Sequence, residues 1–207
     1  MKTVLVTGGT VRLGKSIADF LVERGWRVLV SSHRADSGAD IVADLSFSSG
    51  AVKLYSAAME LLGGVPPDAI VNNAALLDGD PESVENVNFL SPSKLIMLMA
   101  GRETSRGFIV NILDGSLKDE RFGAYNSSKE KLRQYSFRAA ALFADTLNVN
   151  CVSPGPVLVP EGMGMRAGSC PLGKPDATDV AQAVAYLLEA KSVTGVDIPV
   201  DSGLRFF

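Results

Sequence analysis

Short apolar runs alternate with longer segments of helical periodicity along the whole chain. The apolar runs are rich in valine and isoleucine, which favours strands. They predict strands at Thr3–Thr7, Arg27–Ser31, Ile41–Ala43, Ala69–Asn72, Phe108–Ile112, Val149–Ser153 and Val196–Val200. The segments between them predict helices at Arg12–Glu23, Val52–Leu62, Asn88–Ala100, Ala124–Ala144 and Ala177–Glu189. The chain is therefore expected to alternate strand and helix.

The strands predict a parallel sheet, because each is apolar along its length and most are followed by a helix. In the first helix Leu13, Ile17 and Leu21 share one face, and Gly25 follows where a helix end favours a left-handed residue. A length of 207 residues suits one domain. We expect a single α/β domain over residues 1–207: a doubly wound, Rossmann-type sheet of about seven parallel strands with helices on both faces.

Composition narrows the class of protein. The chain is 46% hydrophobic and 21% charged, with a net charge of −3 and a pI near 5.2, which argues against nucleic acid as the main partner. Its apolar runs are too short for a signal peptide or a membrane span. The two cysteines, Cys151 and Cys170, have neither a disulfide framework nor a metal-ligand spacing. We expect a cytoplasmic protein without a metal, a nucleic-acid partner or a membrane contact.

Residues 7–14, TGGTVRLG, connect the first strand to the first helix. Backbone N–H groups at a helix N-terminus, together with the helix dipole, favour an anion such as a pyrophosphate. Gly8 would let the chain turn, and Gly14 would let the helix pack close to the strand or to a ligand. Such glycines are also compatible with close packing alone.

This turn resembles the T-G-x-x-x-G-x-G motif of the short-chain dehydrogenase/reductase family. Thr7, Gly8 and Gly14 match it, whereas Arg12 stands in place of the middle glycine. An arginine at this position is similar to the pteridine-reductase-like branch of the family. Arg12 could add a cation beside cofactor phosphates or face an electron-rich substrate, or it could be a solvated surface residue.

The resemblance continues along the chain in five further stretches. They are Asn72-Asn73-Ala74-Ala75 for N-N-A-G, Asn88 for the helical asparagine, Tyr125 to Lys129 for Y-x-x-x-K, Pro154-Gly155 after the sixth strand, and TGVDIPVDSG for T-G-x-x-x-x-V-D-x-G. Each stretch alone is weak evidence for the resemblance, but five stretches in the expected order are strong evidence. Ala75 departs from the family glycine.

Tyr125 and Lys129 lie four residues apart, so both can face the same cleft. A phenol titrates near pH 10, and a nearby ammonium lowers its pKa toward the range of efficient proton transfer. Tyr125 is thus expected to be the general acid that protonates a carbonyl or imine. The resemblance implies that Lys129 also holds the nicotinamide ribose and that Asn88 supports a proton-relay water near Lys129.

Asp114 stands where the family usually has a catalytic serine. By resemblance to the pteridine-reductase-like enzymes, Asp114 orients the substrate or relays protons to Tyr125. Two alternatives stay open: Ser116, two residues further on, could take the serine's role, or the site could be impaired. We favour Asp114.

Residues at the end of the second strand distinguish NAD from NADP in proteins of this fold. Ser32 occupies the acid position typical of NAD enzymes, and His33 and Arg34 follow it, which suits the 2′-phosphate of NADP(H). Asp44 resembles the family's adenine-contacting aspartate. The expected cofactor-binding residues are Gly8, Thr10, Arg12, Leu13, Gly14, Ser32, His33, Arg34, Asp44, Leu45, Asn73, Ala74, Ala75, Tyr125, Lys129, Pro154 and Gly155.

The sequence therefore predicts an NADPH-dependent reductase that acts on a carbonyl or pterin-like C=N bond of a small molecule. A sugar, alcohol or ketone dehydrogenase is the alternative within the family, since one fold hosts many substrates. A nucleotide-sensing protein without turnover is the alternative of another class. Residues 154–175 are expected to cover the substrate, with Met163 and Met165 lining it or lying exposed. The family resemblance suggests a homodimer or homotetramer packed through residues 88–100 and 124–144.

Overall fold

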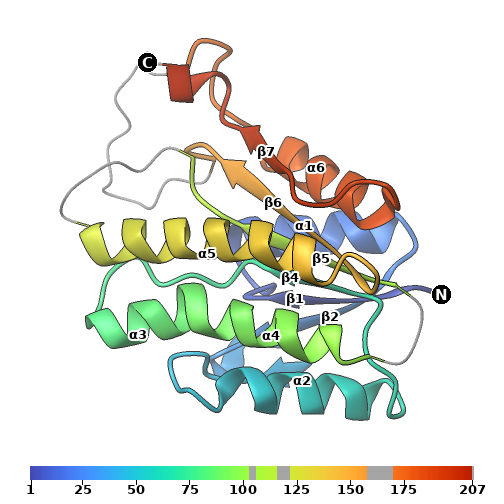
Figure 1. Cartoon of the computed structure of the whole chain (residues 1–207). Coiled ribbons are helices and arrows are strands. Elements are labelled where there is room, and N and C mark those ends of the chain that lie inside the picture. The colour runs from blue at the N-terminus through green and yellow to red at the C-terminus, as the bar shows by residue number, and fades with distance from the viewer. Residues whose placement is uncertain (103–105, 116–121, 158–169, 207) are drawn as a thin grey trace.

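Seven strands form one parallel sheet in the order β3-β2-β1-β4-β5-β6-β7 (Figure 1). The computed structural model describes residues 1–102, 106–115, 122–157 and 170–206. The strands are β1 (Thr3–Thr7), β2 (Arg27–Ser32), β3 (Ile41–Val42), β4 (Ala69–Asn72), β5 (Gly107–Ile112), β6 (Leu147–Pro154) and β7 (Asp197–Val200). This arrangement confirms the predicted doubly wound fold, and each strand lies within two residues of its predicted bounds.

Helices cover both faces of the sheet (Figure 1). They are α1 (Arg12–Glu23), α2 (Gly50–Leu61), α3 (Pro81–Glu85), α4 (Ser91–Ala100), α5 (Gly123–Leu142) and α6 (Ala177–Glu189). Helices α1 and α6 pack on one face, and α2, α4 and α5 pack on the other. Among the described helices, none is long and apolar enough to cross a membrane.

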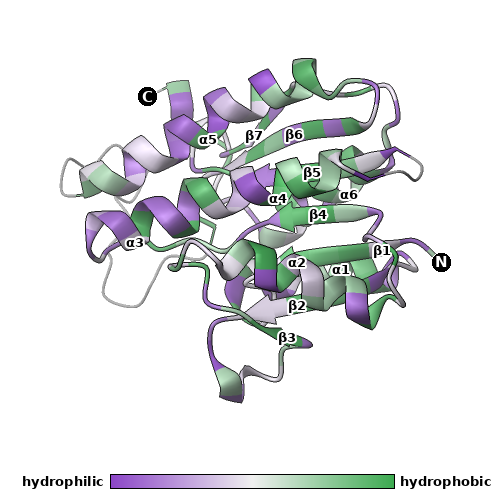
Figure 2. Cartoon of the chain, turned by 60° about the horizontal axis from the view of Figure 1, so that its bottom comes forward, coloured by the Kyte–Doolittle hydropathy of each residue, from purple (hydrophilic) through white to green (hydrophobic). Residues whose placement is uncertain are grey.

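The alternation of side chains along β1 divides the core into two layers. Val4 and Val6 pack toward Ile17 of α1, whereas Leu5 packs toward the opposite layer, which contains Leu54 of α2. All of these side chains are fully buried. Figure 2 shows the central strands largely in the hydrophobic colour, while α3 and parts of α5 are hydrophilic. A sheet covered on both faces thus explains why its strands are apolar throughout.

The helix predicted at Asn88–Ala100 begins earlier in the structure. Asp80 accepts a hydrogen bond from the backbone N–H of Ser83 and caps α3, whose first residue is Pro81. A π-helical turn, Asn86–Leu90, then joins α3 to α4. The helix α3 has only five residues, too few to show a periodic pattern.

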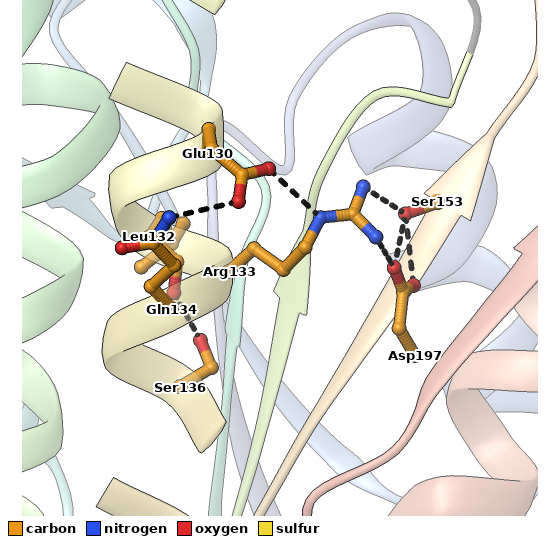
Figure 3. A network of polar contacts seen from close by, with 7 residues as sticks. All are labelled: Glu130, Leu132, Arg133, Gln134, Ser136, Ser153 and Asp197. Atoms are coloured by element: carbon orange, nitrogen blue, oxygen red, sulfur yellow. Dashed lines mark hydrogen bonds and ion pairs between the residues drawn. The ribbon is translucent and has the colours of Figure 1, made fainter. Parts of the chain in front are cut away.

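A polar cluster fastens α5 to the sheet (Figure 3). Arg133 of α5 pairs with Asp197 of β7 and also contacts Glu130 in its own helix. Ser153 of β6 donates to both carboxylate oxygens of Asp197, at 2.8 and 2.9 Å. Because Arg133 lies two turns after Tyr125, the cluster fixes the helix that carries Tyr125 and Lys129.

Candidate functional site

A cavity of about 1020 Å³ lies over the carboxyl ends of the strands. It spans the point where strand order reverses, between β1 and β4, which is where open α/β sheets bind ligands. Its wall comes from the segments that follow β1 to β6 and from the start of α5. Segments far apart in the sequence therefore meet at one edge of the sheet.

The glycine turn after β1 is held by the end of β4. Asn73 Nδ2 donates to the carbonyl oxygens of Thr7 and Gly8, at 2.9 and 3.2 Å. The backbone N–H groups of Asn73 and Ala74 both donate to Thr7 Oγ1 at 3.0 Å. A Cβ on Gly14 would lie 2.1 Å from the Gly8 carbonyl oxygen, so Gly14 is required by close packing of the chain itself. The turn is therefore braced from β4.

Two backbone positions in the turn have positive φ. Gly8 has φ 63°, which a glycine adopts without strain. Arg12 has φ 51°, in the left-handed region that costs other residues about 1–2 kcal/mol. Arg12 is exposed and lines the cavity. The strained position is thus occupied by a cation at the cavity wall.

One end of the cavity, after β2, is polar and contains the Arg34 guanidinium, and it is called the Arg34 end below. Ser32, His33 and Arg34 all line it. Ser32 Oγ accepts a hydrogen bond from the Arg34 backbone N–H at 3.1 Å, which holds the turn. Arg34 Nε and Nη2 donate to the two carboxylate oxygens of Asp36 at 3.1 and 3.0 Å. The sequence analysis did not single out Asp36.

The other end of the cavity contains the predicted acid. Tyr125 Oη donates to Asp114 Oδ2 at 3.0 Å. Lys129 Nζ donates to the Ile112 carbonyl oxygen at 2.9 Å, and it lies 5.6 Å from the centre of the Tyr125 ring. The structure therefore brings Asp114, Tyr125 and Lys129 together. Ser116, Met163, Met165 and most of the 154–175 segment lie outside the described residues.

The prediction that Lys129 lowers the pKa of Tyr125 is wrong for this structure. Burial raises the pKa of Tyr125 well above its ordinary value, and the charge and hydrogen bond of Asp114 raise it further. Burial also lowers the pKa of Lys129 to about 8, against the opposing influence of Asp114. The Lys129 ammonium donates to the Ile112 carbonyl oxygen. The charged group with the largest influence on the pKa of Tyr125 is therefore the Asp114 carboxylate.

Asn88 is part of the wall behind the cavity and does not line it. Its side chain bonds the backbone N–H and carbonyl of Leu76, at 2.8 and 2.9 Å. Asn88 Nδ2 also donates to Ser128 Oγ, which in turn donates to the Tyr125 carbonyl oxygen at 2.7 Å. The side chain thus connects the segment after β4 to α5, and the contact with a water near Lys129 stays a prediction.

Every predicted cofactor residue lines the cavity: Gly8, Thr10, Arg12, Leu13, Gly14, Ser32, His33, Arg34, Asp44, Leu45, Asn73, Ala74, Ala75, Tyr125, Lys129, Pro154 and Gly155. The sequence analysis missed a second group in the wall: Val11, Ser31, Asp36, Ser37, Ala43, Ser46, Leu76, Asp78, Gly79, Asp80, Ser83, Val87, Ile112, Leu113 and Val157. Many of these directly follow a strand or neighbour a motif residue, and this adjacency could have indicated them.

The cavity fits a dinucleotide cofactor. Its volume lies at the upper end of the roughly 300–1,000 Å³ of small-molecule sites. From β2 to β5 the sheet crosses three strand intervals of about 4.8 Å each, so the Arg34 end and the tyrosine end of the cavity are well separated. The start of α1 lies between them and offers backbone N–H groups to an anion. Among the described residues, no group of three or more His, Cys, Asp or Glu side chains is placed to hold a metal ion.

Comparisons with known proteins agree with this geometry. A sequence model of the family described as short chain dehydrogenase matches residues 2–168. An NADP-dependent (R)-specific alcohol dehydrogenase from Lentilactobacillus kefiri is 31% identical over 98% of this chain and 96% of its own length. Carbonyl reductase family member 4 from Xenopus tropicalis is 30% identical over 99% of this chain and 98% of its own length.

A solved structure is also similar over the whole chain. It is FolM, alternative dihydrofolate reductase 1 from Brucella canis, in complex with NADP. The two chains superpose with a TM-score of 0.84 and are 28% identical, and the match covers 100% of this chain and 95% of the other.

Proposed function

This chain belongs to the short-chain dehydrogenase/reductase family of NAD(P)-dependent oxidoreductases, and on that premise we propose that it uses NADPH to reduce a carbonyl or pterin-like C=N bond. The observation that carries the proposal is the Tyr125 hydroxyl, which is buried beside Lys129 and bonded to Asp114 at one end of the cavity. The arginine fork of Arg34 lies at the other end.

The residues at the Arg34 end would hold the adenosine half of the cofactor. Arg34 and His33 would contact the 2′-phosphate, and Asp44 and Leu45 would face the adenine. The start of α1, with Arg12, would receive the pyrophosphate. Lys129, buried next to Tyr125, would bind the nicotinamide ribose. The similar proteins support the choice of NADPH. One relative is described as NADP-dependent, and one similar structure is described in complex with NADP.

When bound, NADPH supplies the hydride, which becomes the new C–H bond of the substrate. The proton that completes the reduction comes from Tyr125, whose O–H bond breaks as a proton bonds to the substrate oxygen or nitrogen. Asp114 accepts the Tyr125 hydrogen bond and so orients the hydroxyl before substrate binds. Lys129 compensates the negative charge that remains on the phenol oxygen.

The electrostatics of the site set the protonation state of Tyr125. Burial and Asp114 both raise the pKa of Tyr125, so the hydroxyl keeps its proton at neutral pH. Reduction needs a protonated acid, whereas oxidation of an alcohol needs the phenolate as a base. The resting site therefore holds the form required for reduction.

Arg12 and Asp114 support the pterin-like substrate class within this proposal. Both line the cavity, so an electron-rich ring system could meet a cation and a hydrogen-bond acceptor there. The similarity to a dihydrofolate reductase of this family is consistent with it. The test is NADPH consumption with a panel of dihydropterins, dihydrofolate and simple ketones. Turnover of at least one is expected, with the pterin-like compounds preferred.

A second candidate is an alcohol or ketone dehydrogenase. It is favoured by the 31% identity to an NADP-dependent (R)-specific alcohol dehydrogenase. The same panel separates the two, since turnover of ketones without turnover of pterin-like compounds would favour this candidate. NADPH binding without consumption across the panel would instead support a nucleotide-sensing protein.

A homodimer or homotetramer remains part of the proposal. The apolar side chains that α4 and α5 leave exposed include Met97, Phe137 and Leu142, which are 55%, 40% and 73% exposed. A second copy packed on these helices would bury them. Sedimentation as a dimer or tetramer is expected, and a monomer at working concentration would contradict this part. A cytoplasmic location is likewise proposed from the sequence.

A further inference from the structure

The guanidinium of Arg34 is already engaged by a carboxylate within the same turn. Its Nε and Nη2 atoms donate to Oδ1 and Oδ2 of Asp36 at 3.1 and 3.0 Å, which is a bidentate, fork-to-fork contact. Both residues line the cavity. One edge of the guanidinium, formed by Nε and Nη2, is therefore occupied by a group that binds it as a phosphate can, through two oxygen atoms.

The local backbone keeps the two side chains together. Residues Ala35–Ser37 form a short 3₁₀ turn, with Gly38 in a left-handed conformation at its end. Ser37 Oγ donates to the Arg34 carbonyl oxygen at 2.6 Å, and the Arg34 N–H donates to Ser32 Oγ. The turn thus presents Asp36 beside the guanidinium in the folded chain.

We propose that Asp36 is a specificity-determining residue that competes with the cofactor's 2′-phosphate for the Arg34 guanidinium. This inference rests on the proposed function, because it assigns Arg34 to the 2′-phosphate. A phosphate dianion that binds the Nε and Nη2 edge of Arg34 must displace the carboxylate, and one that binds elsewhere on the guanidinium still lies near its negative charge. NADH lacks that phosphate and meets neither penalty. Asp36 therefore narrows the preference for NADPH over NADH.

The exposure of the pair makes this exchange possible. The side chains of Arg34 and Asp36 are 60% and 74% exposed, so neither is locked by packing. The contact with the Arg34 guanidinium also lowers the pKa of Asp36, a carboxylate that is already ionised at neutral pH. Exposed ion pairs are weak, so a phosphate can displace Asp36, and the effect of the competition is moderate.

The experiment compares Asp36→Asn with the wild-type chain by calorimetric titration of NADPH, NADH, 2′,5′-ADP and 5′-AMP. The two ligands with a 2′-phosphate are expected to bind about 2- to 10-fold tighter to the variant, because a weak competing ion pair and a nearby like charge are removed. The two ligands without it are expected to bind unchanged. Asp36→Ala is expected to give the same pattern.

Asp19→Asn is the matched control. Asp19 forms a pair with Lys15 at 2.7 Å, with both side chains more than half exposed, but Asp19 does not line the cavity. It should alter none of the four affinities. Unchanged or weaker binding of the 2′-phosphate ligands by Asp36→Asn would overturn the inference. Weaker binding of NADH would also overturn it, since Asp36 would then be a ligand of the ribose hydroxyls.

Arg34→Gln separates this inference from the proposed cofactor site. If Arg34→Gln leaves NADPH affinity unchanged, the assignment of Arg34 to the 2′-phosphate fails, and the inference fails with it. If Arg34→Gln weakens NADPH but Asp36→Asn changes nothing, only the inference fails. In the double variant, Asp36→Asn should lose its selective effect on 2′-phosphate ligands.

Discussion

The two ends of the cavity differ in their exposure to water. Tyr125 and Lys129 are 8% and 6% exposed, whereas the side chains of Arg34 and Asp36 are 60% and 74% exposed. At the buried end, desolvation shifts pKa values in opposite directions for the phenol and the ammonium. At the exposed end, charges exchange partners at little cost. The buried end is thus suited to proton transfer, and the exposed end to selection between cofactors.

The largest expected effect is at the buried end. Tyr125→Phe removes the only proposed proton donor, so kcat should fall by about 10²- to 10⁴-fold. NADPH affinity should change little, because the hydroxyl contacts Asp114 and the substrate. The measurements are steady-state turnover and NADPH titration on the same preparation.

Tyr135→Phe is the control for this change. Tyr135 lies on the same helix and packs against Phe89, outside the cavity. The Tyr135→Phe variant should have the turnover of the wild-type chain. Equal turnover of Tyr125→Phe and wild type would remove Tyr125 from the mechanism. The buried end could then no longer be assigned to proton transfer.

The second effect concerns stability. Burial lowers the pKa of Lys129 to about 8 from its ordinary 10.5, so below pH 8 the folded chain contains a buried charge that destabilises it. Between about pH 8 and 10.5 the unfolded chain binds more protons, so the contribution of Lys129 makes the wild type more stable as pH rises. Lys129→Met should raise Tm at pH 7, because it removes the buried charge. It should also abolish the rise of stability that Lys129 contributes between about pH 8 and 10.5. Its turnover should fall.

The measurement is thermal unfolding of both chains from pH 7 to 10. Lys131→Met is the comparison, because Lys131 is exposed on the same helix and pairs with Glu85. It should not raise Tm at pH 7. A Lys129→Met variant with a lower Tm than wild type would show that the ammonium is stabilised by its partners more than burial penalises it.

The smallest of the three effects is at the exposed end. Arg34→Gln should weaken NADPH by about 10-fold, because a charge-assisted hydrogen bond to phosphate is lost at a solvated position. NADH affinity should stay within about twofold, since it has no 2′-phosphate. Titrations at low and high salt should show a shallower salt dependence for the variant with NADPH. Equal losses of affinity for NADPH and NADH would show that Arg34 binds a part of the cofactor that both contain.

The sequence was sufficient for the sheet and for part of the cavity wall. Runs such as Thr3–Thr7 and Ala69–Asn72 predict their strands to the residue, because apolar strands in a covered parallel sheet differ clearly from their surroundings. Motif residues meet in the cavity because parallel strands end at the same edge. The strands follow from order and spacing along the chain, whereas the choice of the motif residues also depends on the family resemblance.

Side-chain direction and electrostatics could not be predicted in the same way. The side chain of Asn88 turns to Leu76 and Ser128, and that choice depends on how the segment after β4 packs. The raised pKa of Tyr125 depends on burial and on a 3.0 Å contact with Asp114, neither of which spacing specifies. The Arg34–Asp36 contact depends on the conformation of one short turn.

The most direct measurement of the central claim is the transfer of an isotope label. NADPH that carries deuterium at its transferable position is incubated with the substrate panel, and the products are examined by mass spectrometry. The proposed function predicts one deuterium on carbon in the product of the wild-type chain, and at most a trace with Tyr125→Phe. NADPH that binds but transfers no label to any compound, or equal transfer by Tyr125→Phe, would contradict it.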